Sequence, residues 1–213
     1  TPEDYRAYVD GRPRYDGVRT FLASRGITLP EGSPDDPPGT ETVTGLGNRK
    51  NELFHEQLEA LGVDVDRDAV RLVHELRGQG VRVGMATSSR NGAHILERAG
   101  LSELFEARVD GVVSARLGLK GKPAPDIFLE CLRRLGAPDA ARAVIVEDAP
   151  AGVAAGRAGG FGLVLGVARE DNEAELLEHG ADRVVTGFEG VTAERVVQWF
   201  QERARATGAE SAA

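Results

Sequence analysis

The second two-thirds of this chain alternates between two patterns of apolar residues. Short runs rich in β-branched residues are typical of strands buried in a parallel sheet. Between them, apolar residues recur at helical spacing. The alternation predicts a parallel sheet with right-handed crossovers, and hence an α/β fold. The expected strands are residues 81–86, 107–113, 143–146, 162–167 and 182–185; the expected helices are 92–99, 125–135, 151–158 and 173–179, one containing Val70 to Leu76, and one starting near Thr192.

The first part of the chain lacks such strands. Val18, Phe21 and Leu22 recur at helical spacing, as do Leu53, Phe54, Leu58 and Leu61, and both sets are expected to face one small apolar core. Between them, residues 30–40 are rich in Pro, Gly and Asp, which predicts an exposed loop. We therefore expect a partial helical domain at residues 1–68 and an α/β domain at residues 69–213.

Two adjacent carboxylates, Glu147 and Asp148, directly follow the expected strand that ends at Val146. In open α/β sheets, ligands bind at the carboxyl ends of the strands. Two acids placed there repel each other, and a divalent cation would offset that repulsion. Oxygen ligands suit Mg²⁺ better than zinc. The alternative is that Asp148 only caps the following helix.

Polar residues also follow the expected strand that ends at Ala86. Thr87, Ser88, Ser89 and Asn91 supply hydroxyl and amide groups before a helix, where an anion is favoured, although Thr87 could also act as a simple cap. Lys122 lies in a loop whose prolines restrict its conformation; the alternative is an ordinary surface lysine. Together with the carboxylate pair, these groups predict a site for phosphate and magnesium.

Three blocks carry a more specific resemblance. Residues 87–91 (Thr-Ser-Ser-Arg-Asn), 121–126 (Gly-Lys-Pro-Ala-Pro-Asp) and 146–152 (Val-Glu-Asp-Ala-Pro-Ala-Gly) resemble, in order, the second, third and fourth motifs of the haloacid dehalogenase-like hydrolases, and most of all the β-phosphoglucomutase-like branch. The similarity extends over essentially the whole chain. It implies a Rossmannoid parallel sheet with a helical cap domain, and Mg²⁺ as the cofactor.

The resemblance also implies a role for each candidate residue. Glu147 and Asp148 would position Mg²⁺, and Thr87 would bind the transferring phosphoryl group. Lys122 would neutralise the charge of the nucleophile and of that group. Ser88, Ser89 and Asn91 would contact the phosphate or the substrate. Arg49 and Lys50 match a basic patch that faces the active site in this branch, although simple exposure at an early helical turn is an equal alternative.

The family's first motif, an Asp-x-Asp at the end of a central first strand, has no counterpart here. Asp16-Gly17 has Arg14 two positions before it, and Asp10-Gly11 has Tyr8 in the nucleophile's place. We expect the strand that carries the nucleophile to lie upstream of Thr1. Its place in the sheet would be between the strands that end at Ala86 and Val146. Residues 1–213 alone are then expected to lack phosphatase activity.

Composition narrows the class of partner. A net charge of −8 and a pI near 5.1 argue against a nucleic-acid partner. No apolar stretch is long enough to span a bilayer. A single cysteine excludes an internal disulfide and fits a reducing cytoplasm, and we expect a cytoplasmic monomer. The four histidines lack ligand spacing such as His-x-x-x-His, which assigns them to surface or packing positions.

The resulting expectation is a magnesium-dependent phosphatase or phosphotransferase that acts on a small phosphorylated metabolite, most simply a sugar phosphate. The reaction would pass through an aspartyl-phosphate. Two alternatives stay open: a β-phosphoglucomutase-type isomerase, and a catalytically inactive module that keeps the anion and metal sites for binding.

Overall fold

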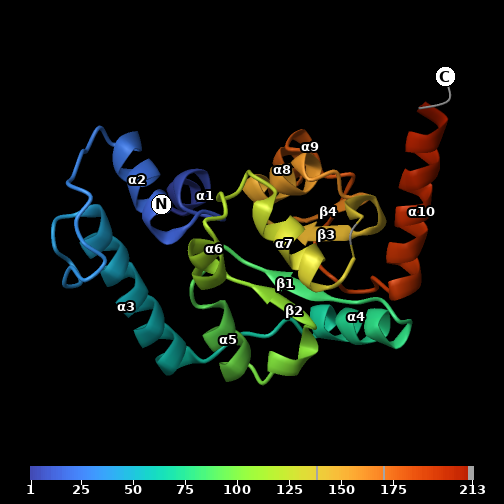
Figure 1. Cartoon of the computed structure of the whole chain (residues 1–213), viewed down its shortest axis with the longest axis horizontal. Helices are drawn as coiled ribbons and strands as arrows, with labels where there is room; N and C mark the ends of the chain where they lie inside the picture. Colours follow the sequence, from blue (N-terminus) through green and yellow to red (C-terminus); the bar gives the residue numbers. More distant parts are fainter. Residues whose placement is uncertain (138, 170, 211–213) are drawn as a thin grey trace.

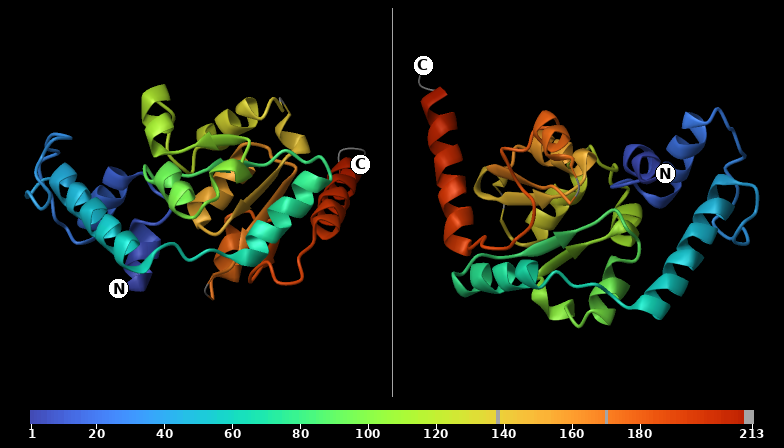
Figure 2. Two further views of the ribbon diagram at one scale, coloured as in Figure 1. Left: turned by 90° about the horizontal axis from the view of Figure 1, so that it is seen from below. Right: turned by 180° about the vertical axis from the view of Figure 1, so that it is seen from behind.

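The computed structural model describes residues 1–137, 139–169 and 171–210. At one side lie three helices that pack on one another, here called the helical part: α1 (Pro2–Tyr8), α2 (Arg14–Ser24) and α3 (Val43–Leu61) (Figure 1). An extended connection leads from α3 to α4, where the α/β part begins (Figure 2). The division into two domains stays a prediction, and its expected boundary at residue 68 falls in the first turn of α4.

The α/β part alternates helices and strands, which confirms the predicted fold class. No helix in the described part of the chain has the length and apolar character needed to cross a membrane. The elements are α4 (Arg67–Gly78), β1 (Gly84–Ala86), α5 (Gly92–Arg98), η1 (Ser102–Leu104), β2 (Ala107–Val109), α6 (Gly111–Leu117), α7 (Asp126–Arg134), η2 (Ala140–Arg142), β3 (Val144–Glu147), α8 (Pro150–Ala158), β4 (Leu163–Val167), α9 (Glu173–Glu178), β5 (Arg183–Val185) and α10 (Ala193–Glu210).

The strands are all parallel and form two separate sheets. β1 pairs with β2, with Gly84 opposite Ala107, and the second sheet has the order β3-β4-β5, with Val144 opposite Leu163. Within the described ranges, no strand pairing joins β1 to β3. Val146, in β3, is 47% exposed, which is high for a strand of an α/β core. A further strand between β1 and β3 remains a prediction.

Helices cover both faces of the strands. Successive side chains of a strand point to opposite faces, so Ile145 and Val164 join one apolar cluster while Val144 and Val167 join the other. The first cluster includes α7, α8 and residues of both sheets. The second is built on α4 and α10. These two layers hold the carboxyl ends of β1 and β3 in one region of the surface.

Two local expectations were wrong. The run at residues 107–113 is a strand only to Val109, because the Asp110 side chain accepts hydrogen bonds from the backbone of Val112 and Val113 and caps α6. In the helical part Leu22 and Leu58 are buried, but Phe21, Leu53 and Leu61 are 36%, 44% and 85% exposed. Helical spacing alone did not reveal that α3 ends at Leu61, beyond the helices against which it packs.

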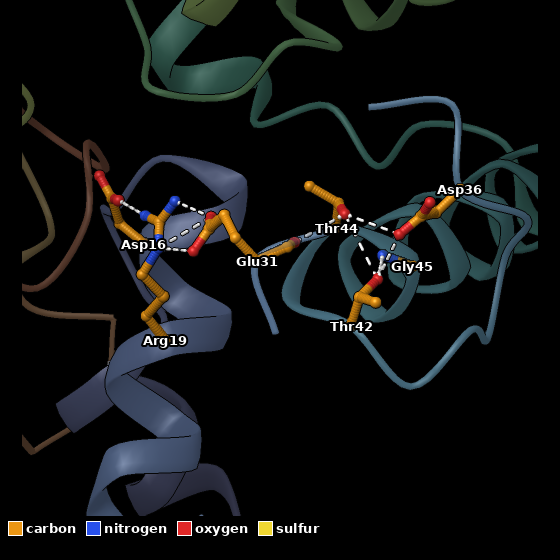
Figure 3. Close-up of polar contacts among 7 residues, drawn as sticks. All are labelled: Asp16, Arg19, Glu31, Asp36, Thr42, Thr44 and Gly45. Atoms are coloured by element: carbon orange, nitrogen blue, oxygen red, sulfur yellow. Dashed lines mark hydrogen bonds and ion pairs between the residues drawn. The ribbon is translucent and has the colours of Figure 1, made fainter. Parts of the chain in front are cut away.

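The loop at residues 30–40 is fastened to α3 by hydroxyl groups (Figure 3). Thr42 Oγ1 donates to Asp36 Oδ2 at 2.6 Å and accepts from the Gly45 amide at 2.9 Å, which caps the helix. Thr44, only 4% exposed, donates to the carbonyl of Glu31 at 2.8 Å. On the other side, Arg19 of α2 pairs with the Glu31 carboxylate. The loop is therefore joined to both α2 and α3.

Candidate functional site

A cleft of about 530 Å³ lies between the helical part and the carboxyl ends of β1, β3 and β4. It collects all but one of the residues that the sequence singled out. Those residues are Lys50, Thr87, Ser88, Ser89, Asn91, Lys122, Glu147 and Asp148. The exception is Arg49, which lies outside the cleft and pairs with Glu52 and, at 3.6 Å, with Glu56.

Lys122 and Glu147 form a buried ion pair at the floor of the cleft. Their side chains are 5% and 9% exposed, and the Lys122 ammonium also lies 4.9 Å from the centre of the Phe128 ring. Burial raises the pKa of Glu147, an effect that the Lys122 charge opposes. Lys122 is thus not an ordinary surface lysine. The charge of Glu147 is held by Lys122, so its carboxylate is less available to a cation than that of Asp148.

Asp148 opens into the cleft. Its side chain is 54% exposed, and Arg169 Nε lies 3.7 Å from its carboxylate. The capping alternative is not supported, because α8 has Ala149 at its N-cap and no side-chain cap hydrogen bond. Asp148 is therefore the more accessible of the two adjacent carboxylates.

The segment after β1 turns sharply beside these acids. The Ser89 amide donates to Thr87 Oγ1 at 3.1 Å, and the Asn91 amide donates to Ser89 Oγ at 3.1 Å. The Thr87 amide donates to the carbonyl of Val109 at 2.9 Å, which fixes the turn to the end of β2. In this arrangement the Thr87 and Ser89 oxygens accept backbone protons, which leaves their hydroxyl protons for an anion.

The connection between α1 and α2 contacts two loops of the α/β part, the loop after β3 and the loop that carries Lys122. A Cβ at Gly11 would lie 3.2 Å from that of Ala149, and a Cβ at Gly121 would lie 2.9 Å from the Pro13 ring. Asp10 belongs to this connection and lines the cleft. Burial and then the charge of Asp148 raise the pKa of Asp10, so two carboxylates from different parts of the molecule face the same space.

A second group of polar side chains forms the wall contributed by the helical part. The Arg14 guanidinium donates to Asn51 Oδ1 at 2.7 Å, and the side-chain amide of Asn91 donates to the same oxygen at 2.9 Å. Lys50 lies 5.6 Å from the centre of the Tyr5 ring. Burial, followed by the positive charge of Arg14, lowers the pKa of Lys50. This wall therefore holds two cations close to each other.

Several of these residues were missed at the level of sequence. Arg169 comes just after β4, as Asp148 comes just after the neighbouring strand β3. The rule that ligands bind at the carboxyl ends of parallel strands, which drew attention to Asp148, therefore applies to Arg169 as well. In the sequence, Asp10 and Arg14 belong only to rejected matches to the nucleophile motif, and Asn51 is only the residue after Arg49 and Lys50. Their place in the cleft depends on how the helical part packs against the α/β part.

The donor set fits magnesium. Within the described ranges, no group of three or more His, Cys, Asp or Glu side chains is placed to hold a metal ion. Mg²⁺ does not need such a group, because it commonly keeps several waters and takes only one or two carboxylates from the protein. Asp148 supplies an exposed carboxylate at the cleft, and Asp10 adds negative charge nearby.

Comparisons with known proteins agree with this geometry. A family model described as haloacid dehalogenase-like hydrolase matches residues 3–160. A β-phosphoglucomutase of Mycobacterium bovis is 48% identical over 187 residues, which cover 86% of this chain and 71% of that protein. An uncharacterized glycosyl hydrolase of Mycobacterium tuberculosis is 42% identical over 192 residues, or 90% of this chain but only 14% of that protein. The crystal structure of a β-phosphoglucomutase from Clostridium difficile has the same fold, with a TM-score of 0.74 at 18% identity, over 95% of this chain and 82% of that one.

Proposed function

Because this chain belongs to the haloacid dehalogenase-like hydrolase family, we propose that it performs magnesium-dependent phosphoryl transfer on a sugar phosphate, as a mutase of the β-phosphoglucomutase type. The 48% identical relative of that name supports the choice of a mutase over a simple phosphatase.

The observation that carries this proposal is that one cleft has two places for a phosphate. Lys122 lies at the floor, paired with Glu147, and Asp148 lines the same cleft, while Arg14 and Lys50 lie on the wall of the helical part. Mg²⁺ at Asp148 together with Lys122 would meet one phosphate of a sugar bisphosphate, and the two cations of the wall would meet the other. A mutase needs this arrangement, because the sugar must be held by one phosphate while the other end reacts. A phosphatase for a monophosphate needs only the first place.

The surroundings of Asp148, Lys122 and Thr87 support a specific role for each residue in phosphoryl transfer. Mg²⁺, held by Asp148, would neutralise phosphoryl charge. Lys122 adds a fixed positive charge, and its ion pair with Glu147 keeps it in one position. Thr87 donates its hydroxyl proton to a phosphoryl oxygen. The Asp-x-Asp motif of the family would supply the attacking carboxylate that forms the aspartyl-phosphate.

A phosphatase is the second candidate, because the matching family model is that of a hydrolase and Asp148 is open to solvent. A mutase must keep water away from the phosphorylated carboxylate until the sugar arrives. In this proposal, the helical part serves as the cap that closes over the cleft.

The test uses the product of the complete coding sequence. It is given β-glucose 1-phosphate, a trace of β-glucose 1,6-bisphosphate and Mg²⁺, and both glucose 6-phosphate and inorganic phosphate are measured. Glucose 6-phosphate without matching phosphate release supports the mutase. Phosphate release from a panel of sugar phosphates, without isomerisation, identifies a phosphatase. Neither product from any of these substrates would overturn the proposal and favour a binding module.

A further inference from the structure

Two histidines from different parts of the molecule meet outside the cleft. His55 lies on α3 in the helical part, and His94 lies on α5 in the α/β part. Their ring centres are 5.4 Å apart, and the ring planes are inclined by 56°. The Phe54 ring packs edge-on against His55, with its centre 5.7 Å away, which limits the orientations that the imidazole adopts. Neither histidine lines the cleft described above.

The separation of the rings is in the range of an ordinary ring contact, and it also equals the separation expected around a shared metal ion. Two imidazoles that bind one tetrahedral zinc ion through N–Zn bonds of about 2.0–2.1 Å have ring centres about 5 Å apart. Neutral imidazole is the commonest protein ligand for such ions. His94 is exposed and His55 is half-buried, so an ion could reach the pair from solvent, and water would fill its remaining positions.

The chemistry of this pair differs from that of the cleft. Imidazole nitrogen favours Zn²⁺, Ni²⁺ and Cu²⁺, whereas Mg²⁺ favours carboxylate and water oxygens. The described residues include no third His, Cys, Asp or Glu placed to complete a metal group with these two. The pair therefore suits a transition metal held by two protein ligands, and Mg²⁺ will not compete for it.

The position of the pair gives such a site a structural consequence. The side chains of Asn51 on α3 and Asn91 at the N-cap of α5 are hydrogen-bonded at 2.9 Å. About one helical turn further along the chain, α3 carries His55 and α5 carries His94. The side chains of these four residues thus connect α3 to the start of α5 at two successive levels. A metal ion at the second level would link the helical part to the α/β part.

We propose that His55 and His94 form a transition-metal site, for an ion such as Zn²⁺ or Ni²⁺, that fastens α3 to α5. The site is independent of phosphoryl transfer and of the magnesium site. The competing explanation is a simple contact between two uncharged rings, with no affinity for metal.

The experiment is calorimetric titration of residues 1–213 with zinc chloride and with nickel chloride, in the presence of excess Mg²⁺. We expect saturable binding of one transition-metal ion per chain. His55→Gln and His94→Gln should each weaken it by at least tenfold. His74→Gln, which changes an exposed histidine on α4, is the matched control and should bind like the wild type.

Thermal unfolding with and without Zn²⁺ gives a second readout, since an ion that binds only the folded chain raises its melting temperature. Circular dichroism checks each variant. If His55→Gln fails to fold because the contact with Phe54 is lost, the test of metal binding rests on His94→Gln. His94 is exposed, so its replacement should leave the fold intact. No saturable binding by the wild type, or unchanged binding by His94→Gln, would overturn the proposal.

Discussion

The Lys122 ammonium and the Glu147 carboxylate are paired in a place that almost no solvent reaches, with side chains 5% and 9% exposed. The two residues come from different elements: the loop before α7 and the end of β3. Each charge is tolerated because the other is present, since an unpaired charge in such surroundings costs several kcal/mol.

Lys122→Ala should therefore lower both stability and rate. Removal of one partner of a buried ion pair costs about 3–5 kcal/mol of stability, and loss of one electrostatic contact to the transition state costs about a hundred- to a thousandfold in rate. Urea unfolding and turnover by the complete protein are the measurements. Lys120→Ala, an exposed lysine in the same loop, is the control and should change neither. Near-normal turnover by Lys122→Ala would show that the loop is only structural.

Asp148→Asn should separate metal binding from folding. The carboxylate is 54% exposed, so its replacement by an amide of similar shape should leave the unfolding curve nearly unchanged. Mg²⁺ affinity should fall, and high magnesium should restore part of the rate, whereas it should not rescue Lys122→Ala. The measurement is rate against magnesium concentration for both variants. Equal magnesium dependence in the wild type and Asp148→Asn would remove Asp148 from the metal site.

Asn51→Ala should weaken substrate binding more than it affects the chemical step. It removes the oxygen that accepts hydrogen bonds from both Arg14 and Asn91, at a cost of about 1–2 kcal/mol, or roughly five- to thirtyfold in KM. Asn48→Ala is the matched control, because Asn48 is on the same helix but bonds to Tyr15 and to the 30–40 loop. A drop in kcat at constant KM would argue against a positioning role.

Gly152→Ala should disturb the Lys122–Glu147 ion pair through its acidic partner, Glu147. A Cβ at this position would lie 2.3–2.5 Å from the carboxyl atoms of Glu147, so this carboxyl must shift. Both charges remain, so we expect a loss of stability smaller than the cost of about 3–5 kcal/mol for removal of one partner of a buried pair. Gly78→Ala, with no atom within 4 Å of the new Cβ, should be neutral or slightly stabilising. The measurement is urea unfolding of both variants. Equal unfolding midpoints for Gly152→Ala and Gly78→Ala would contradict the expected contact between the new Cβ and Glu147.

Acid should weaken the protein in part through Glu130. Hydrogen bonds from Arg133 and then Arg134 lower the pKa of this carboxyl from 4.5 to about 2. Between these values the unfolded chain binds more protons than the folded one. The contribution of Glu130 is therefore present above pH 4.5 and is lost as the pH falls toward about 2. Urea midpoints from pH 6 down to pH 2.5 should fall less steeply in Glu130→Gln than in the wild type. Glu97→Gln, which changes an exposed residue of α5, should follow the wild type.

Local patterns predicted the α/β part well because each strand and helix there is specified by its own apolar residues. The predicted strand at residues 162–167 is β4, in which every residue is buried. The error at residues 107–113 arose where a single carboxylate, Asp110, starts a helix inside an apolar run. One side-chain cap outweighed the strand pattern.

The site was predictable where it depends on strand ends. Asp148 and Thr87 follow β3 and β1, and the parallel sheet rule brings them to one edge. Arg14 and Asn51 depend instead on the packing of α2 and α3 against the α/β part, which no local pattern encodes. The same reason explains the histidines. Ligand spacing within one segment could not reveal that His55 and His94 meet across two helices.

The pairing of Lys122 with Glu147 depends on how α7 packs. Lys122 lies in the loop before α7, and Glu147 lies at the end of β3. Residues of α7 share one apolar cluster with residues of β2 and β3, whereas no strand pairing joins β1 to β3 within the described ranges. The geometry of the ion pair is therefore set by side-chain packing, and a substitution in that cluster would act on the pair without removing any strand–strand hydrogen bond.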